Sequence, residues 1–258
     1  ELVRCIVPAS QSAAAGVVPV RLLNNDAVYT SMVAFTYRTL AVVDRIHPVA
    51  GVLGGGTLVT VYGTGFTESV ASHCKFAGAA VPARLISPGQ LECASPRPSA
   101  AGYVALEVTM NEQDYSIDGT LFEFQPAATV LAVEPSRGPL DGGSFVNVTG
   151  TGFSQRAALL GYLWCRFNQT AVVAAWVSST EVNCIAPEHA GGAVAVELTQ
   201  NDQQYTSNGV SYEYEHVEAH SIHPNTGPTL GGTLVEVRGA NIEVPDARGL
   251  FCQFGGAE

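Results

Sequence analysis

Residues 138–153, "GPLDGGSFVNVTGTGF", decide the fold of this chain because their pattern occurs three times. The stretch "HPVAGVLGGGTLVTVYGTGF" begins at His47, "EPSRGPLDGGSFVNVTGTGF" at Glu134 and "HPNTGPTLGGTLVEVRGANI" at His223, and the three align without a gap. Their starting points lie 87 and 89 residues apart, which is the length of a small domain. The sequence is therefore built from tandem repeats.

A second block repeats with the same period. It begins "RCIVPASQ" at Arg4, "ECASPRPS" at Glu92 and "NCIAPEHA" at Asn183, and its copies end in "FTY", "FEF" and "YEY". The order of the two blocks predicts four parts: the end of one repeat at 1–37, whole repeats at 40–125 and 128–216, and the start of another at 217–258.

Apolar residues alternate with polar ones inside each repeat. Val146 and Val148 flank Asn147, and the other two copies have valines flanking Thr60 and Glu236. A period of two indicates half-buried strands, and frequent Gly and Pro without a helical stripe favour short antiparallel strands. We expect an all-β chain of sandwiches with little helix.

The glycines of the opening stretch serve this fold. Gly residues supply the positive φ of a tight corner before the strand. A nucleotide-binding loop needs a Lys after its last Gly, and a dinucleotide loop opens a helix, whereas a β-patterned strand follows all three copies here. A phosphate-binding function is thereby disfavoured.

Composition excludes some functions. The chain has 258 residues, 47% of them hydrophobic, and a net charge of −11 from 12 basic and 23 acidic residues. Such a charge disfavours nucleic acid as a partner. No apolar run reaches the length of a membrane span, so we expect no direct membrane insertion by this segment, and no signal peptide is visible.

The six cysteines follow the repeats. Cys74 and Cys93 lie 19 residues apart, as do Cys165 and Cys184, which predicts one disulfide in each whole repeat. Zinc is the alternative, but each repeat offers only two such ligands. In the alignment of the repeats, the first member of the pair is matched by Cys252 and the second by Cys5. These two are expected to pair outside the excerpt, and the pattern points to an oxidising compartment.

Two sequons predict N-linked glycans. "NVT" begins at Asn147, on the outward phase of its strand, and "NQT" begins at Asn168, where a turn is expected.

These residues together resemble a known family. The pattern "I-x-P-x-x-G-P-x-x-G-G-T-x-V-x-V-x-G-x-x-F", followed by "C-x-F", "L-x-C-x-x-P" and a closing aromatic pair, is similar to the IPT/TIG domain over essentially the whole chain. The resemblance implies an early-set immunoglobulin-like β-sandwich. Its DNA-binding branch uses Arg-rich loops that are missing here, so the likeness is to the extracellular branch.

No catalytic arrangement recurs in the repeats, and we expect no enzyme activity and no cofactor. The motif "N-[DE]-x-x-Y-[ST]" at Asn25, Asn111 and Asn201 has two interpretations: a calcium site, or a hairpin turn in which Asn adopts the left-handed conformation with Tyr29, Tyr115 or Tyr205 packed behind it. The turn is favoured, since each copy has too few carboxylates.

One histidine cluster does not repeat. His216, His220 and His223 lie at the start of the last part and form a secondary candidate for a transition-metal site or a pH-sensitive hinge. In an extended segment the third histidine points away from the other two, so the prediction is no metal.

Short junctions between the repeats predict a semi-rigid, elongated rod. We expect a non-catalytic stalk, spacer or filament element, such as a segment of a ciliary or flagellar surface filament, within a large secreted or cell-surface glycoprotein. Its partners would be other proteins or further copies of the array. The alternatives are a ligand-binding receptor ectodomain of the plexin or fibrocystin type and the spacer domains of an extracellular carbohydrate-active enzyme.

Overall fold

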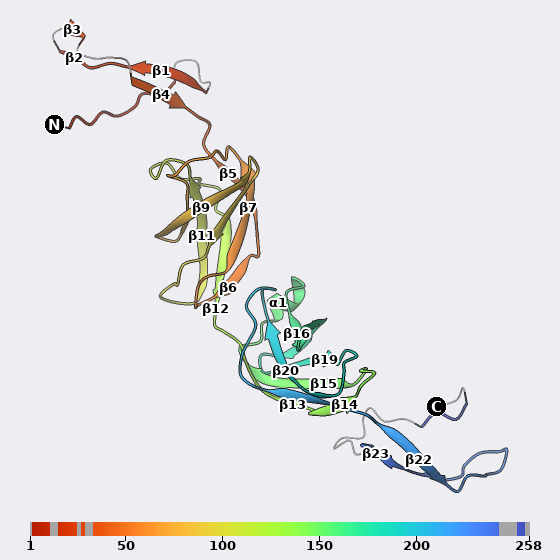
Figure 1. Cartoon of the computed structure of the whole chain (residues 1–258). Coiled ribbons are helices and arrows are strands. Elements are labelled where there is room, and N and C mark those ends of the chain that lie inside the picture. The colour runs from red at the N-terminus through yellow and green to blue at the C-terminus, as the bar shows by residue number, and fades with distance from the viewer. Residues whose placement is uncertain (1, 11–14, 25–26, 29–32, 243–251, 256–258) are drawn as a thin grey trace. The chain divides into compact units, whose positions relative to one another are not determined.

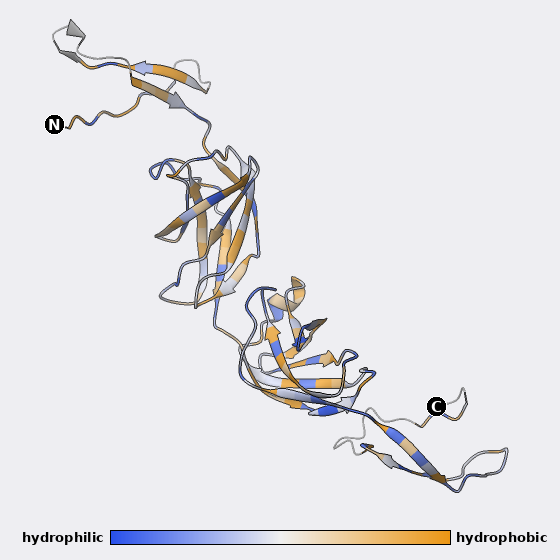
Figure 2. Ribbon diagram, viewed as in Figure 1, coloured by the Kyte–Doolittle hydropathy of each residue, from blue (hydrophilic) through white to orange (hydrophobic). Residues whose placement is uncertain are grey.

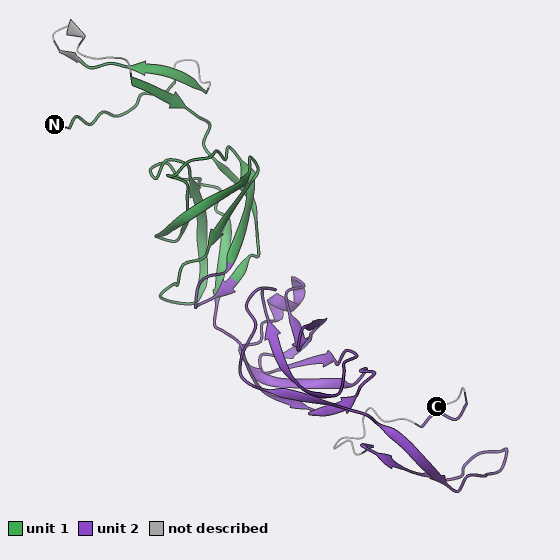
Figure 3. Cartoon of the chain, viewed as in Figure 1, with its two compact units in different colours: residues 1–50, 58–124 green, residues 51–57, 125–258 purple. Residues whose placement is uncertain are grey.

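The regular secondary structure of the described residues is almost entirely β-strand, as the sequence predicts. The computed structural model describes residues 2–10, 15–24, 27–28, 33–242 and 252–255 (Figure 1). Within them, the one helix found has five residues, far fewer than a membrane crossing needs. The chain divides into two compact units, residues 1–50 with 58–124 and residues 51–57 with 125–258 (Figure 3).

The segment 42–125 forms eight strands joined in the order β5-β7-β10-β9-β8-β11-β12-β6. The long strand β9 pairs antiparallel with both β8 and β10 and so links the two halves of this order. The strands are β5 (Val42–His47), β6 (Ala50–Val52), β7 (Leu58–Thr64), β8 (His73–Phe76), β9 (Ala79–Ser87), β10 (Gln90–Ala94), β11 (Gly102–Thr109) and β12 (Leu121–Gln125).

The segment 129–215 forms a two-sheet sandwich. One sheet has the order β13-β15-β19-β18 and the other β14-β21-β20-β16-β17. Its elements are β13 (Thr129–Glu134), β14 (Arg137–Pro139), β15 (Phe145–Thr151), α1 (Gln155–Leu159), β16 (Trp164–Phe167), β17 (Thr170–Val173), β18 (Ala175–Ser178), β19 (Glu181–Ile185), β20 (Gly192–Thr199) and β21 (Ser211–Glu215).

The terminal segments contain short hairpins. In the first, β1 (Gly16–Val20) pairs with β4 (Val33–Tyr37), and β2 (Leu23–Asn24) pairs with β3 (Ala27–Val28). In the last, β22 (Glu218–His223) pairs with β23 (Glu236–Ala240). Every residue of β1 and of β22 is exposed, so these strands cover no core of their own.

Alternation along the strands creates the cores. In β15 the inward Val146 and Val148 are fully buried, and Val59 and Val61 are equally buried in β7. Figure 2 shows the corresponding alternation of hydrophobic and hydrophilic bands along the strands of the second unit. Each fully buried Val or Phe contributes about 1.5–3 kcal/mol relative to an exposed one. The period of two seen in the sequence is therefore the period of burial.

The repeated glycines fall where the backbone requires them. Gly142 and Gly143 adopt positive φ of 72° and 81° at the corner before β15, and Gly55 and Gly56 do so before β7. A Cβ on Gly150, inside β15, would overlap the carbonyl oxygen of Thr129 on the neighbouring strand. The motif thus encodes a tight corner followed by close strand packing. The peptide bonds at the start of the motif, His47–Pro48, Glu134–Pro135 and His223–Pro224, are all cis.

Helix α1 marks the main insertion in the second repeat. Cys165 comes 12 positions after Phe153, whereas Cys74 comes only 8 positions after Phe66. The extra residues form one helical turn, capped by Ser154, whose side chain accepts a hydrogen bond from the backbone N–H of Ala157 at 3.2 Å.

Candidate functional site

A disulfide lies at the centre of each repeat. Cys74 on β8 is bonded to Cys93 on β10, and Cys165 on β16 to Cys184 on β19, with Cα–Cα distances of 6.3 and 6.4 Å. All four cysteines are buried. The second bond joins the two sheets of its sandwich, because β16 and β19 belong to different sheets. This leaves no pair of free thiolates in these repeats to bind zinc.

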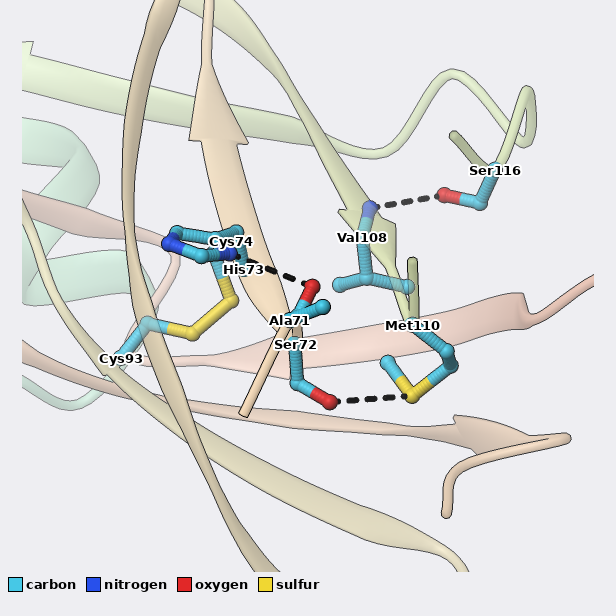
Figure 4. The surroundings of a disulfide bond; sticks show 8 residues. All are labelled: Ala71, Ser72, His73, Cys74, Cys93, Val108, Met110 and Ser116. Carbon is cyan, nitrogen blue, oxygen red and sulfur yellow. Dashed lines mark hydrogen bonds between the residues drawn. A yellow bond between two sulfur atoms is a disulfide. The ribbon is translucent and has the colours of Figure 1, made fainter. Parts of the chain in front are cut away.

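Polar groups around the first disulfide are paired with one another (Figure 4). The Ser72 hydroxyl donates to the Met110 sulfur at 3.5 Å, and the Ser116 hydroxyl oxygen accepts from the Val108 N–H at 3.1 Å. The His73 Nδ1 lies 3.2 Å from the Ala71 carbonyl oxygen. These hydrogen bonds stabilise the fold around the disulfide.

A cation, a glutamate and a tyrosine form a matched group on the strand beside each disulfide. In the first repeat, Lys75 Nζ lies 2.5 Å from a Glu107 oxygen and 3.9 Å from the centre of the Tyr115 ring. In the second repeat, Arg166 pairs with Glu197 through two nitrogens and lies 3.8 Å above the Tyr205 ring. The tyrosine of the "N-[DE]-x-x-Y" motif therefore covers an ion pair, a role that the sequence did not predict.

The turn before this tyrosine differs in detail from the sequence-based prediction. The left-handed residue is the acidic one after the asparagine, with φ of 62° at Glu112 and 60° at Asp202. The asparagine side chain holds the turn in both repeats. The Oδ1 atoms of Asn111 and Asn201 each accept hydrogen bonds from the backbone N–H groups two and three residues further along the chain. Asn25 and Tyr29, in the first copy, lie outside the described residues.

A second matched side chain caps a β-bulge in each repeat. The Asp118 carboxylate accepts the Val43 N–H at 2.7 Å, and the Asn208 Oδ1 accepts the Val130 N–H at 2.8 Å. The register of β5 with β7 and of β13 with β15 shifts just after these N–H groups. At such a shift a ladder partner is lost, and the side chain replaces it.

The two sequons occupy different environments. Asn147 is half-buried on β15, a strand with neighbours on both sides, and its amide nitrogen donates to Glu181. Asn168 is exposed in the turn between β16 and β17, with φ of 55°, and its Nδ2 lies 3.2 Å from His189 Nε2.

The histidine cluster is arranged around one carboxylate. His216 Nδ1 and His220 Nε2 each lie 3.1 Å from an oxygen of Glu218, and all three side chains are exposed. Within the part of the chain that the structure describes, no group of three or more His, Cys, Asp or Glu residues has the geometry of a metal site. His223 lies at the end of β22.

Two buried tyrosines distinguish the second core from the first. Tyr212 and Tyr214 on β21 replace Phe122 and Phe124 on β12, and all four rings are at most 2% exposed. Burial raises the pKa of Tyr212, and burial together with the neighbouring Tyr212 raises the pKa of Tyr214 to about 12. The ring of His189 stacks on Tyr214 with a centroid distance of 5.0 Å. The aromatic pair was recognised in the sequence, but the sequence did not predict that its hydroxyl groups are buried.

Comparison with known proteins identifies the repeats. The model of the IPT/TIG domain matches residues 41–124 and 128–214. Human fibrocystin-L is 24% identical over 217 residues, which are 81% of this chain and 5% of that protein. Mouse plexin-A2 is 27% identical over 234 residues, which are 84% of this chain and 12% of that protein. The chain thus spans a small part of these relatives.

A solved structure of the full extracellular region of plexin A4 has the same fold. It aligns with a TM-score of 0.50 and 23% identity, over 77% of this chain and 18% of that one. Disulfides persist in oxidising surroundings, and each of the two whole repeats contains one. This segment is accordingly extracellular. Since the family model covers most of its residues in two tandem positions, the chain belongs to the IPT/TIG domain family.

Proposed function

We propose that this segment is a non-catalytic spacer with lateral protein contacts inside a large cell-surface glycoprotein. In this proposal residues 40–125 and 128–216 are complete domains, and residues 1–37 and 217–258 are parts of neighbouring ones. Cys5 and Cys252, both exposed and unbonded in the described residues, pair with cysteines outside the excerpt.

One observation carries the proposal: the polar side chains that recur in both repeats are used within the fold. The disulfide, the cation–glutamate–tyrosine group and the bulge cap each recur, and each bonds within its own repeat. Chemistry that acts on a substrate needs groups that remain available to it. What is repeated here serves stability, which suits a spacer.

The short junctions support a rod. Few residues separate β4 from β5, β12 from β13 and β21 from β22. Linkers of this length restrict the motion of adjacent domains. Small-angle X-ray scattering of the chain tests this expectation: a maximum dimension close to that of one compact globule of equal mass would contradict the rod.

A receptor ectodomain is the second candidate function, and the relatives favour it. Plexin-A2 matches 84% of the chain at 27% identity. In that case the activity would depend on an exposed face of one repeat that contacts a protein ligand, whereas a spacer acts mainly through its length.

A replacement experiment in the full-length protein separates the two functions. Residues 40–216 are exchanged for two unrelated immunoglobulin-like domains of similar length, and a second variant deletes the same residues. If the segment is a spacer, the full-length protein with the exchanged domains keeps its activity at the cell surface, and the protein with the deletion loses part of it. Loss of activity in both variants would instead support ligand binding by these repeats.

N-linked glycans at Asn147 and Asn168 are part of the proposal, since the segment is extracellular and both residues begin sequons. Peptide mapping of protein from a eukaryotic secretory host tests occupancy at each site. Absence of glycan from both peptides would overturn this part.

A further inference from the structure

Asn208 and Gly209 form the chain's one Asn-Gly pair and occupy an exposed connection. They lie between the isolated bridge at Tyr205 and strand β21, outside any strand. The Asn208 Oδ1 holds the Val130 N–H at 2.8 Å, and Gly209 has φ of 76°. This pair therefore combines a structural hydrogen bond with an accessible backbone.

The first repeat has the same site with a different side chain. Asp118 and Gly119 occupy the matching positions, Gly119 has φ of 70°, and the Asp118 carboxylate holds the Val43 N–H at 2.7 Å. The fold thus accepts an aspartate at the place where the second repeat has an asparagine. Aspartate is also the hydrolysis product of asparagine.

We propose that Asn208 is a self-deamidation site whose aspartate product is accommodated by the fold. The backbone nitrogen of Gly209 attacks Cγ of Asn208, so a C–N bond forms and the bond from Cγ to Nδ2 breaks. The amide nitrogen departs as ammonia with the proton of the attacking N–H. Water then opens the cyclic imide at one of its two carbonyls and gives aspartate or isoaspartate.

The surroundings of the pair favour this reaction. Gly209 has no side chain to obstruct the attack, and even a Cβ built there would meet no atom within 4 Å. In the described part of the chain no hydrogen bond engages the Gly209 N–H, so its nitrogen is not held by a ladder partner. The exposed Asn208 side chain gives water access to the imide.

The other sequence contexts provide internal controls. Asn147 precedes a valine on a strand, and Asn168 precedes a glutamine. Asn201 is buried, and its Oδ1 accepts backbone N–H groups of its own turn. Asn208 should therefore react first among the asparagines of the described repeats.

The two products should differ in stability. Aspartate keeps the acceptor at the same distance from the backbone, as Asp118 does in the first repeat. Isoaspartate adds one methylene to the main chain and displaces the acceptor from the Val130 N–H. The aspartate form should retain the melting temperature of the unmodified chain, and the isoaspartate form should lose part of it.

The test is peptide mapping of the folded full chain after incubation at mildly alkaline pH. Enzymatic deglycosylation is omitted, because amidase removal of an N-linked glycan converts the asparagine that carried it to aspartate. We expect a mass increase of about 1 Da, from exchange of NH for O, in the peptide that contains Asn208 while the peptides of Asn168 and Asn201 stay unchanged. The denatured chain under the same conditions gives the reference rate.

Variants test the second part of the proposal. Asn208→Asp should melt no lower than the wild type, whereas Asn208→Ala, the matched control without an acceptor, should melt lower. The proposal is overturned if folded Asn208 stays intact while the denatured chain reacts. It is equally overturned if Asn208→Asp melts as low as Asn208→Ala.

Discussion

The two repeats share their internal bonds and differ in the polarity of their cores. Both have a buried disulfide, a capped bulge and a tyrosine over an ion pair at matching positions. The first closes its core with Phe122 and Phe124, and the second with Tyr212 and Tyr214. The comparison teaches that the IPT/TIG fold keeps its framework fixed while one buried aromatic pair tolerates hydroxyl groups.

The largest expected effect comes from breaking the framework. Replacing Cys74 and Cys93 with alanine, or Cys165 and Cys184 in a matched variant, should destabilise the altered repeat by about 3 kcal/mol through the 19-residue loop. Both tryptophans of the chain lie between residues 128 and 216, so tryptophan fluorescence in denaturant reports the second repeat. A lower fluorescence midpoint in the first variant would contradict independent stabilisation of the repeats.

Alkaline pH should lower the stability of the second repeat, whose core contains the buried tyrosines. Burial raises the pKa of Tyr214 to about 12, so in the folded state its proton is retained while the unfolded chain loses it near the ordinary pKa of 10.0. The unfolded state then binds fewer protons, and stability falls as pH rises from about 10 to about 12. Denaturant midpoints followed by tryptophan fluorescence should fall across this window, and Tyr214→Phe should reduce the fall. An unchanged slope in that variant would contradict the assignment.

A steric test concerns Gly138, which the tyrosine hydroxyl approaches closely. A Cβ on Gly138 would overlap the Tyr212 hydroxyl and crowd the Ser144 Oγ. Gly138→Ala should therefore destabilise the second repeat by about 1–3 kcal/mol, as overpacking does. Tyr212→Phe, which copies the first repeat, should recover part of the loss. Additive effects of the two changes in a double-mutant cycle would show that the two groups do not interact.

Removing the bulge caps should have a smaller effect. Asp118→Ala leaves the Val43 N–H without its acceptor, and Asn208→Ala does the same to the Val130 N–H. We expect losses of about 2 and about 1 kcal/mol, the larger from the charged acceptor. Calorimetry of the two variants measures both, and equal or reversed losses would contradict the role of charge.

The smallest effects should come from the surface ion pairs. Lys75→Met keeps the length of the side chain but removes its pairing with Glu107 and its contact with Tyr115. The expected cost is about 0.5–1 kcal/mol, because the pair is partly exposed to solvent. Arg166→Met should cost slightly more, since two guanidinium nitrogens engage Glu197. High salt should reduce both differences.

Much of the fold could be read from periodicity. The alternation around Val59 and Val146 fixed the inward face, and the glycine pairs before each strand marked the corners. These signals are local, because strand burial and positive φ depend on neighbouring residues. The cysteine spacing added one long-range restraint per repeat.

Other features required the tertiary structure. The left-handed residue of the turn is Glu112 or Asp202, because the preceding asparagine uses its side chain to hold the loop. The pairing of Asp118 with Val43 joins residues 75 positions apart, and no pattern in the sequence relates them.

The sequence by itself determined the repeats, the strand faces and the cysteines that fall at matching positions, because these follow from spacing along one chain. Only the tertiary structure decided which polar side chains form internal hydrogen bonds and ion pairs, since each such group bonds to a backbone or side chain brought near by sheet pairing.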